Sequence, residues 1–220
     1  NMTNYFRYVV YLVVLLGVSL ANAGSYDEFF AALQRDDAVQ VRQLISRGFD
    51  PNTVNSKGDY ALIVALREPS LKVVSVLLES PKTRAEVRTA KDESPLMLAA
   101  LKGYQEICQQ LIKRDADVNK PGWTPLHYAA TGGHTSVMRL LLDNYAYIDA
   151  ASPNGSTPLM MAAMYGTQDA AKLLLDAGAD PKLKNAKGLN AIDFARQVQR
   201  EEMALLIASA IRSRKPKGVW

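Results

Sequence analysis

The side chains best suited to chemistry are few in this chain of 220 residues, which holds two histidines and one cysteine. An enzyme needs a base, a nucleophile or a metal cage brought together at one point. A zinc site needs several ligands at defined spacing, and His127, His134 and Cys108 cannot supply them. The serines and carboxylates are scattered without a partner base. We therefore expect no catalytic residue, no metal and no cofactor, and we expect that the chain is not an enzyme.

The elements that carry the two histidines are predicted to be short paired helices. Thr124 can cap a helix N-terminus, and Pro125 can take the first helical position, where a missing N–H does no harm. Gly132 and Gly133 allow the left-handed backbone that ends such a helix. Apolar residues then return at helical spacing, which predicts a second helix with one apolar face. Two short helices cannot bury that face alone, so the unit must stack on copies of itself.

Copies of this unit recur along the chain with a period of about 33 residues, which is typical of stacked repeats. The positions equivalent to Thr124 are Asp27, Tyr60, Ser94, Thr157 and Asn190. A proline follows the cap again at Pro95 and Pro158, and the helix-ending glycine recurs at Gly103 and Gly166. These residues start or end helices at the same place in each repeat, so the period indicates a repeated structure.

At this point the chain resembles the ankyrin repeat family. The resemblance is carried by TPLHYAATGGH at 124–134, GSTPLMMAAMYG at 155–166, DADVN at 115–119 and DAGAD at 176–180. It implies an all-α fold, an α-solenoid of stacked helix-turn-helix ankyrin repeats with short finger loops. It covers nearly everything after residue 26. The implied domain spans 24–211 in six repeats, at about 27–55, 56–89, 90–119, 120–152, 153–185 and 186–211.

The resemblance also gives the candidate chemical residues a role in folding. His127 occupies the fourth place of TPLH, where the family's histidine makes hydrogen bonds that tie the turn together. His134 follows the turn glycine, where the family again often has histidine. Cys108 falls on the inward face of a second helix, which predicts a buried small hydrophobe. The alternative for Cys108 is an intermolecular disulfide or a reactive thiol, since a lone cysteine excludes an internal disulfide.

Residues 1–23 form a separate element. Arg7 gives a positively charged start, 9–20 is nearly all apolar, and 21–23 has the small-x-small pattern of a cleavage site. This pattern predicts a secretory signal peptide, because the apolar run is short for a transmembrane helix of about 20 residues. We expect export to the periplasm of a bacterium. The alternative left open is an uncleaved anchor in the inner membrane.

The formal net charge of +4 comes mostly from a basic tail at 212–220. Such a tail is expected to be a solvated end, with contact to anionic lipid or to an acidic partner as the alternative. Membrane contact would otherwise need the uncleaved N-terminal segment. No aromatic residues alternate with the tail's charges as a stacking platform requires, so we expect no nucleic acid among the partners. We also expect no small-molecule substrate.

Recognition of another protein remains, and the resemblance assigns it to a concave face made by the fingers and the outward side of each first helix. The expected partner-binding residues are Arg67, Glu68, Leu101, Lys102, Trp123, Met164, Tyr165 and Leu189. Lys120, Ser156 and Val198 are further positions expected to be exposed there. The apolar members of these sets are expected to form a strip, of the residue types enriched in interface cores. The alternative is that some of them, Trp123 above all, fold inward.

Two tyrosines stand apart from this face. Tyr145 and Tyr147 occupy positions where the family usually has glycine and aspartate, on the opposite, convex-side turn. They are expected to serve packing or a minor contact. The whole pattern predicts a non-catalytic protein-binding module. The open alternatives are an immunity protein that neutralises a periplasmic toxin, an adaptor for a periplasmic enzyme, and a membrane-tethered scaffold.

Overall fold

The computed structural model describes residues 8–11 and 24–213, which form helices joined by loops, with an isolated bridge between Val54 and Tyr60. The chain divides into two compact units, Asn1–Arg84 and Ala85–Trp220. The predicted signal peptide lies outside the described residues except for a helical stretch at 8–11, and so does the basic tail after residue 213. Within 8–11 and 24–213, no helix is both long and apolar enough to span a bilayer.

Unit 1 contains a helical segment at 24–34 followed by α2 (Ala38–Ser46), α3 (Ala61–Arg67) and α4 (Leu71–Glu79), with α4 packed on both α2 and α3. Phe29, Leu33 and Leu77 are fully buried in its core. The Phe29 ring lies against that of Phe49, with 4.4 Å between the ring centroids. The prediction that Asp27 caps the first helix is wrong, because this helix has already begun at residue 24.

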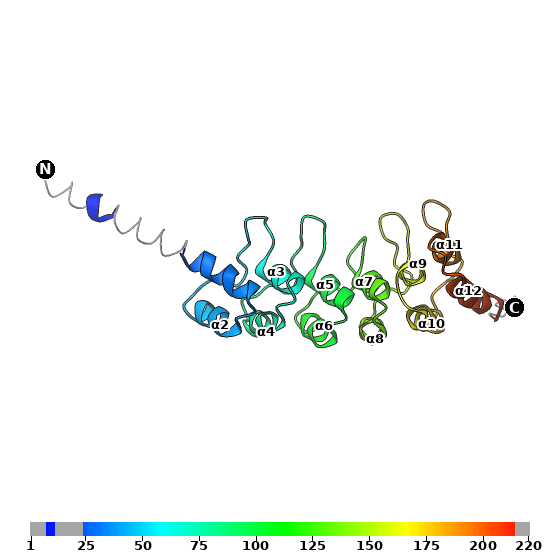
Figure 1. Cartoon of the computed structure of the whole chain (residues 1–220), viewed down its shortest axis with the longest axis horizontal. Helices are drawn as coiled ribbons and strands as arrows, with labels where there is room; N and C mark the ends of the chain where they lie inside the picture. Colours follow the sequence, from blue (N-terminus) through cyan, green and yellow to red (C-terminus); the bar gives the residue numbers. More distant parts are fainter. Residues whose placement is uncertain (1–7, 12–23, 214–220) are drawn as a thin grey trace. The chain divides into compact units, whose positions relative to one another are not determined.

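Unit 2 contains four helix pairs in two layers (Figure 1). The first helices of the pairs are α5 (Pro95–Lys102), α7 (Pro125–Gly132), α9 (Pro158–Met164) and α11 (Ala191–Gln197), and they pack on one another in that order. The second helices are α6 (Gln105–Ile112), α8 (Thr135–Asp143), α10 (Gln168–Asp176) and α12 (Glu201–Ser213). We call the layer of first helices, with the finger loops that precede them, the front face, and the layer of second helices the back face. The all-α repeat solenoid expected from the sequence is confirmed.

The first helices begin where the predicted caps place them. The hydroxyl of Thr124 accepts the backbone N–H of His127 at 3.4 Å, and that of Ser94 accepts the N–H of Met97 at 3.2 Å. Asn190 caps α11 in the same way, with 3.1 Å to the N–H of Asp193. Because a capping side chain satisfies a backbone donor that lacks an intrahelical partner, each cap fixes where its helix starts.

The predicted helix-ending glycines serve two different needs. Gly103 and Gly133 have φ values of 75° and 72°, the left-handed backbone that ends α5 and α7. Gly132 and Gly166 do not adopt it. A Cβ atom on Gly166 would lie only 2.2 Å from the carbonyl oxygen of Ala130, so this glycine permits close approach of neighbouring repeats. The prediction that Gly166 ends its helix by a left-handed turn is therefore wrong.

Candidate functional site

The two histidines considered for catalysis or metal binding, His127 and His134, have structural roles instead. His127 is fully buried, and burial lowers the pKa of its imidazole to about 4. Its Nδ1 accepts the N–H of Thr124 at 3.1 Å, and its Nε2 lies 2.9 Å from the carbonyl oxygen of Ser156 in the next finger. His134 Nε2 lies 2.9 Å from the carbonyl oxygen of Leu101. The folding roles expected for both histidines are confirmed.

The lone cysteine is equally unsuited to chemistry. Cys108 is fully buried in α6, as expected, and burial raises the pKa of its thiol to about 12. A thiol that stays protonated is a poor nucleophile and a poor metal ligand. Across 8–11 and 24–213, no three side chains of histidine, cysteine, aspartate or glutamate come together as metal ligands.

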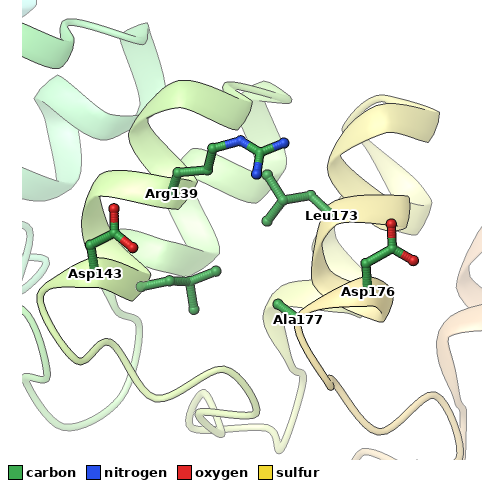
Figure 2. A pocket seen from close by; sticks show the side chains of 6 residues that line it. Arg139, Asp143, Leu173, Asp176 and Ala177 are labelled. Atoms are coloured by element: carbon green, nitrogen blue, oxygen red, sulfur yellow. The ribbon is translucent and has the colours of Figure 1, made fainter.

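The surface of unit 2 carries two hollows that could receive part of another molecule. One lies on the back face between α8 and α10, has a volume of about 470 Å³, and is lined by Arg139, Leu142, Asp143, Leu173, Asp176 and Ala177 (Figure 2). The other lies on the front face between α5 and α7, has a volume of about 200 Å³, and is lined by Leu101, Trp123, Tyr128 and Thr131. We call the first the α8–α10 groove and the second the Trp123 hollow.

The Trp123 hollow joins two of the predicted partner-binding residues. Leu101 comes from the end of α5, and Trp123 comes from the finger loop just before α7. Trp123 is half-buried, with its ring edge-on to His127 and 5.2 Å between the ring centroids. It is thus neither folded into the core nor free in solvent. Its indole forms one wall of a surface hollow.

The other two lining residues come from α7. The hydroxyl of Thr131 donates to the carbonyl oxygen of His127 at 2.8 Å, so its hydrogen-bonding need is met within the helix. The hydroxyl of Tyr128 donates to Glu93 Oε1 at 3.4 Å. Burial, with the nearby charge of Glu93, raises the pKa of Tyr128 to about 12, so the phenol stays neutral. The hollow therefore presents mainly apolar walls with one neutral hydroxyl.

Tyr128 is a residue that the sequence reasoning missed as part of this surface. Its position falls in the apolar run of the helix, and the equivalent positions in the other repeats of unit 2 are indeed nearly buried, at Leu98, Met161 and Phe194. The only signal was a hydroxyl-bearing ring where the other repeats have apolar side chains.

The volume of the Trp123 hollow lies below the roughly 300–1,000 Å³ typical of small-molecule sites. It suits one large side chain of a partner better than a metabolite.

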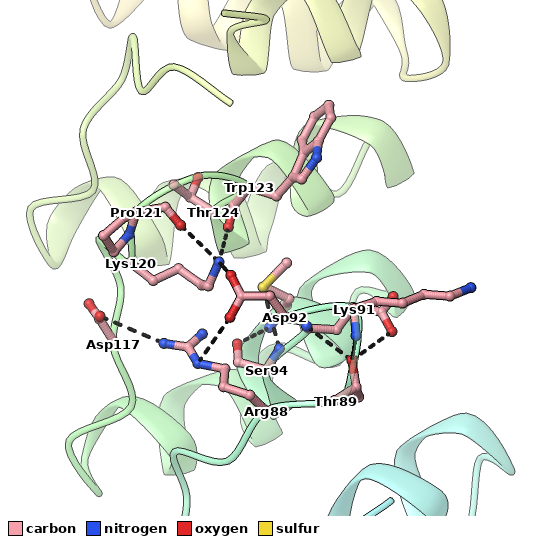
Figure 3. Close-up of polar contacts among 12 residues, drawn as sticks. Arg88, Thr89, Lys91, Asp92, Ser94, Asp117, Lys120, Pro121, Trp123 and Thr124 are labelled. Carbon is pink, nitrogen blue, oxygen red and sulfur yellow. Dashed lines mark hydrogen bonds and ion pairs between the residues drawn. The ribbon is translucent and has the colours of Figure 1, made fainter. Parts of the chain in front are cut away.

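A polar junction centred on the buried side chain of Lys120 supports the Trp123 finger (Figure 3). Lys120 Nζ contacts Asp92 Oδ2 at 2.5 Å, and it also donates to the carbonyl oxygens of Pro121 at 2.9 Å and Trp123 at 3.0 Å. The hydrogen bond from Lys120 holds the pKa of the Asp92 carboxyl below its usual value. The ammonium group thus ties the finger before α7 to the finger before α5. Because it bonds the carbonyl of Trp123 itself, it also fixes where the indole begins.

Arg88 extends this junction to two further carboxylates. Its Nη2 lies 2.6 Å from Glu86 Oε1 and 3.9 Å from Asp117 Oδ2, and its Nε lies 4.0 Å from Asp92 Oδ1. Glu86 in turn accepts the backbone N–H of Asp117 at 2.9 Å. Burial raises the pKa of Glu86.

The expectation that Lys120 and Ser156 are exposed on the front face is wrong. Lys120 is only 3 % exposed, because the clipped finger turns its ammonium inward onto Asp92. Ser156 is fully buried, because its backbone closes the next finger and its carbonyl pairs with His127. Both follow from hydrogen bonds that neighbouring fingers make with each other.

The remaining predicted residues of unit 2 do not line the Trp123 hollow. Met164 ends α9 and is half-buried, whereas Tyr165 caps that helix and is 59 % exposed. Leu189 is half-buried in the finger before α11, where its N–H donates to Asn185 Oδ1 at 3.0 Å. Lys102 is exposed at the end of α5, beside Leu101. These residues lie on the front face: Lys102 is beside the hollow, Met164 and Tyr165 are in the next repeat, and Leu189 is in the repeat after that.

The predicted charged residues Arg67 and Glu68 belong to unit 1. Arg67 ends α3 and its Nη1 lies 2.8 Å from Asp59 Oδ2. Glu68 caps the same helix and is exposed. Contact of Arg67 and Glu68 with a partner stays a prediction.

Comparison with known proteins gives consistent matches. A family model described as ankyrin repeats in three copies matches residues 29–121 and 119–185. An ankyrin repeat-containing protein of Treponema pallidum is 26% identical over 200 residues, which cover 86% of this chain and 65% of that protein. The mouse B-cell lymphoma 3 protein homolog is 29% identical over 163 residues, which cover 71% of this chain and 36% of that protein. This chain therefore spans less than two thirds of the length of both relatives.

A solved structure shows the same architecture. The crystal structure of an ankyrin repeat domain from Acinetobacter baumannii AYE matches with a TM-score of 0.70 at 26% sequence identity. The match covers 83% of this chain and 96% of that domain.

Proposed function

This chain belongs to the ankyrin repeat family, whose members are generally non-catalytic protein–protein interaction modules, and we propose that it binds another protein through the front face of unit 2. The binding surface is centred on the Trp123 hollow. It holds no arrangement of acid, base and nucleophile, and its histidine is locked in the fold. The role of the surface is recognition.

The observation that carries this proposal is the half-buried indole of Trp123 in a hollow with apolar walls. Trp and Tyr are enriched among the residues that dominate binding energy, which lie near the centre of an interface in pockets that lose water on binding. A partner side chain that fills the hollow would remove Leu101, Trp123 and Tyr128 from water together. The buried ammonium of Lys120 holds this finger in place, so little ordering entropy is lost on binding.

The surrounding front-face residues supply the rest of the surface. Tyr165 offers a large exposed ring, and Met164 and Leu189 add half-buried apolar area. Lys102 places a positive charge beside Leu101, where it can select partners that carry a nearby carboxylate.

Truncation of the hollow tests the proposal. Material co-purified with the chain from its native compartment identifies the partner, and its affinity is then measured by calorimetry for Trp123→Ala and Tyr165→Ala. We expect each change to cost about 2 kcal/mol or more if the residue is an interface hot spot. The matched control is Leu205→Ala, which removes an exposed apolar side chain of similar exposure to Tyr165 from α12, outside the front face.

A further variant separates binding from folding. Thr131→Arg replaces one lining residue with a long side chain that fills the hollow and leaves Leu101, Trp123 and Tyr128 in place, and we expect it to abolish binding while urea unfolding stays unchanged. If Trp123→Ala, Tyr165→Ala and Thr131→Arg all bind as the wild type does, the front face is not the binding surface.

We also propose that the chain is exported and works in the periplasm. The support is the charged start, apolar run and small-x-small pattern within residues 1–23. N-terminal sequencing of the protein from a periplasmic extract tests this: a first residue of Gly24 is expected. An intact N-terminus in the membrane fraction would instead favour an inner-membrane anchor and a tethered scaffold.

A further inference from the structure

The α8–α10 groove on the back face has a chemistry of its own. Its apolar lining residues are Leu142, Leu173 and Ala177. The carboxylates of Asp143 and Asp176 stand on its two flanks, and the guanidinium of Arg139 reaches from α8 toward Leu173 (Figure 2). It lies on the second helices, so it shares no lining residue with the Trp123 hollow.

The two aspartates occupy places that do not favour the helices. Asp143 is the last residue of α8, and Asp176 is the last residue of α10. The dipole of a helix is negative at its C-terminal end, so a carboxylate there is repelled and a cation is attracted. Among the residues that the structure describes, neither aspartate forms an ion pair. The groove thus carries two carboxylates, one at the C-terminal end of each helix, together with the guanidinium of Arg139 and three apolar side chains.

The turn that follows α8 shows an independent sign of binding. Tyr145 is 86 % exposed and has φ of 64°, a left-handed conformation that costs a non-glycine residue free energy. Two of the equivalent positions hold glycine, Gly48 and Gly178, for which this conformation is not strained, and the third holds Asp115, with φ of 61°. Because the Tyr145 ring is exposed to solvent, burial of the ring does not offset this strain. Local strain kept without a packing benefit points to a role in binding.

This turn is also held in place. Asn119 donates from its amide to the carbonyl oxygen of Tyr145 at 2.8 Å and accepts the N–H of Tyr147 at 2.8 Å. Tyr147 is itself 68 % exposed. The two rings are therefore presented to solvent on a fixed turn, two and four residues beyond Asp143. The expectation that these two tyrosines serve packing is wrong, because both rings lie outside the core.

We propose that the α8–α10 groove and the tyrosines of the adjoining turn form a second docking site, for a protein segment that carries a lysine or arginine beside an apolar side chain. The apolar side chain packs against Leu142 and Leu173. The basic group lies at the edge formed by Asp143 and Asp176, where two carboxylates and two helix ends attract it. Tyr145 adds an aromatic face of the kind that binds cations. This site is additional to the front-face binding proposed above and does not depend on it.

Selection from a random peptide library tests this chemistry directly, whatever the natural partner is. Random 12-residue peptides displayed on phage are selected on the full chain and counter-selected on the variant Asp143→Lys/Asp176→Lys. We expect the retained peptides to share a lysine or arginine next to a leucine, isoleucine, valine or phenylalanine. A synthetic copy of the most enriched peptide then serves as the probe for affinity measurements.

Matched variants decide where that peptide binds. Asp143→Lys/Asp176→Lys is expected to weaken binding about tenfold or more, and Tyr145→Ala several-fold. Asp169→Lys makes one of these aspartate-to-lysine changes on an exposed residue in the first turn of α10, outside the groove, and is expected to leave binding within about twofold of the wild type. Trp123→Ala is expected to do the same, which separates this site from the front face. Circular dichroism checks that each variant is folded.

Three results would overturn the proposal. The first is the recovery of no peptide that distinguishes the wild type from Asp143→Lys/Asp176→Lys. The second is equal loss of binding in Asp169→Lys, or loss in Trp123→Ala, because the peptide would then respond to overall charge or occupy the front face. The third is a concentration-dependent dimer in analytical ultracentrifugation that dissociates on Arg139→Glu, because the occupant of the groove would then be a second copy of this chain.

Discussion

The buried imidazole of His127 makes stability depend on pH in a way that can be calculated. Its Nδ1 accepts the N–H of Thr124, so Nε2 carries the proton and donates to the carbonyl oxygen of Ser156. A proton on Nδ1 would place two donors face to face in a site without water contact. Burial accordingly lowers the pKa from 6.5 to about 4.

The sign of the effect follows from where the proton binds more tightly. The unfolded chain takes up the proton near pH 6.5, whereas the folded chain resists it until about pH 4. The stability contributed by neutral His127 is therefore complete above pH 6.5 and is lost as the pH falls toward 4. At 1.36 kcal/mol for each pKa unit, the whole loss is about 3 kcal/mol, of which about 2 kcal/mol has occurred by pH 5.

A comparison variant removes the contribution of every other titrating group. His127→Met introduces the residue that the neighbouring repeats hold at this place, where Met97 and Met160 accept the N–H of their cap residues at 3.4 Å. At pH 7.5 the variant should be less stable by about 1–3 kcal/mol, because the carbonyl of Ser156 loses a buried donor. Between pH 7.5 and pH 5.0 the wild type should lose about 2 kcal/mol more than the variant does.

Urea unfolding followed by circular dichroism at the two pH values measures both quantities. The double difference between proteins and between pH values isolates the imidazole. Parallel pH dependences of the wild type and the variant would refute the reasoning, since they would show that His127 binds its proton equally well in the folded and unfolded chain.

Other outcomes follow from the same structure. Burial raises the pKa of the Cys108 thiol to about 12, so Ellman's reagent at pH 8 should react with Cys108 only after urea unfolds the chain; rapid reaction with the folded chain would contradict the buried position. Lys120→Met should destabilise the chain by about 1–2 kcal/mol, because two finger carbonyls lose their donor. It should also raise the pKa of Asp92 toward 3.8, as followed by NMR titration; an unchanged Asp92 titration would mean that the ammonium does not control this carboxylate. Tyr145→Gly should stabilise the chain by about 1 kcal/mol in urea unfolding, because glycine adopts the left-handed conformation without strain; a loss of stability would show that the ring has a packing role.

The exposed strain at Tyr145 and the exposed charges of Asp143 and Asp176 have a common implication for stability. Each is unfavourable for the isolated fold, and each lies at or beside the α8–α10 groove. The inward faces of α8 and α10 are fully buried at Val137, Leu141 and Leu174. Because this burial stabilises the stacked repeats, they can tolerate unfavourable residues on the surface. The surface is therefore free to carry residues suited to binding.

The repeat and its local geometry could be predicted from the amino-acid sequence. Thr124 and Ser94 cap their helices where their types and spacing predict, and Gly133 takes the left-handed backbone expected of it. Caps and glycine turns depend on interactions within a few residues, so a single chain segment encodes them. The period of the apolar residues likewise required stacked helix pairs, because one pair cannot bury its own apolar face.

Which of these residues remain on the surface could be learned from the folded chain alone. Lys120 was expected to face a partner, yet it is buried because the neighbouring finger supplies Asp92. Trp123 stands half-buried because α5 and α7 meet beside it to form a hollow. Gly166 is needed because the carbonyl of Ala130 in the preceding repeat approaches it closely. Each outcome depends on contacts between repeats about 30 residues apart, and a pattern read along one repeat contains no information about those contacts.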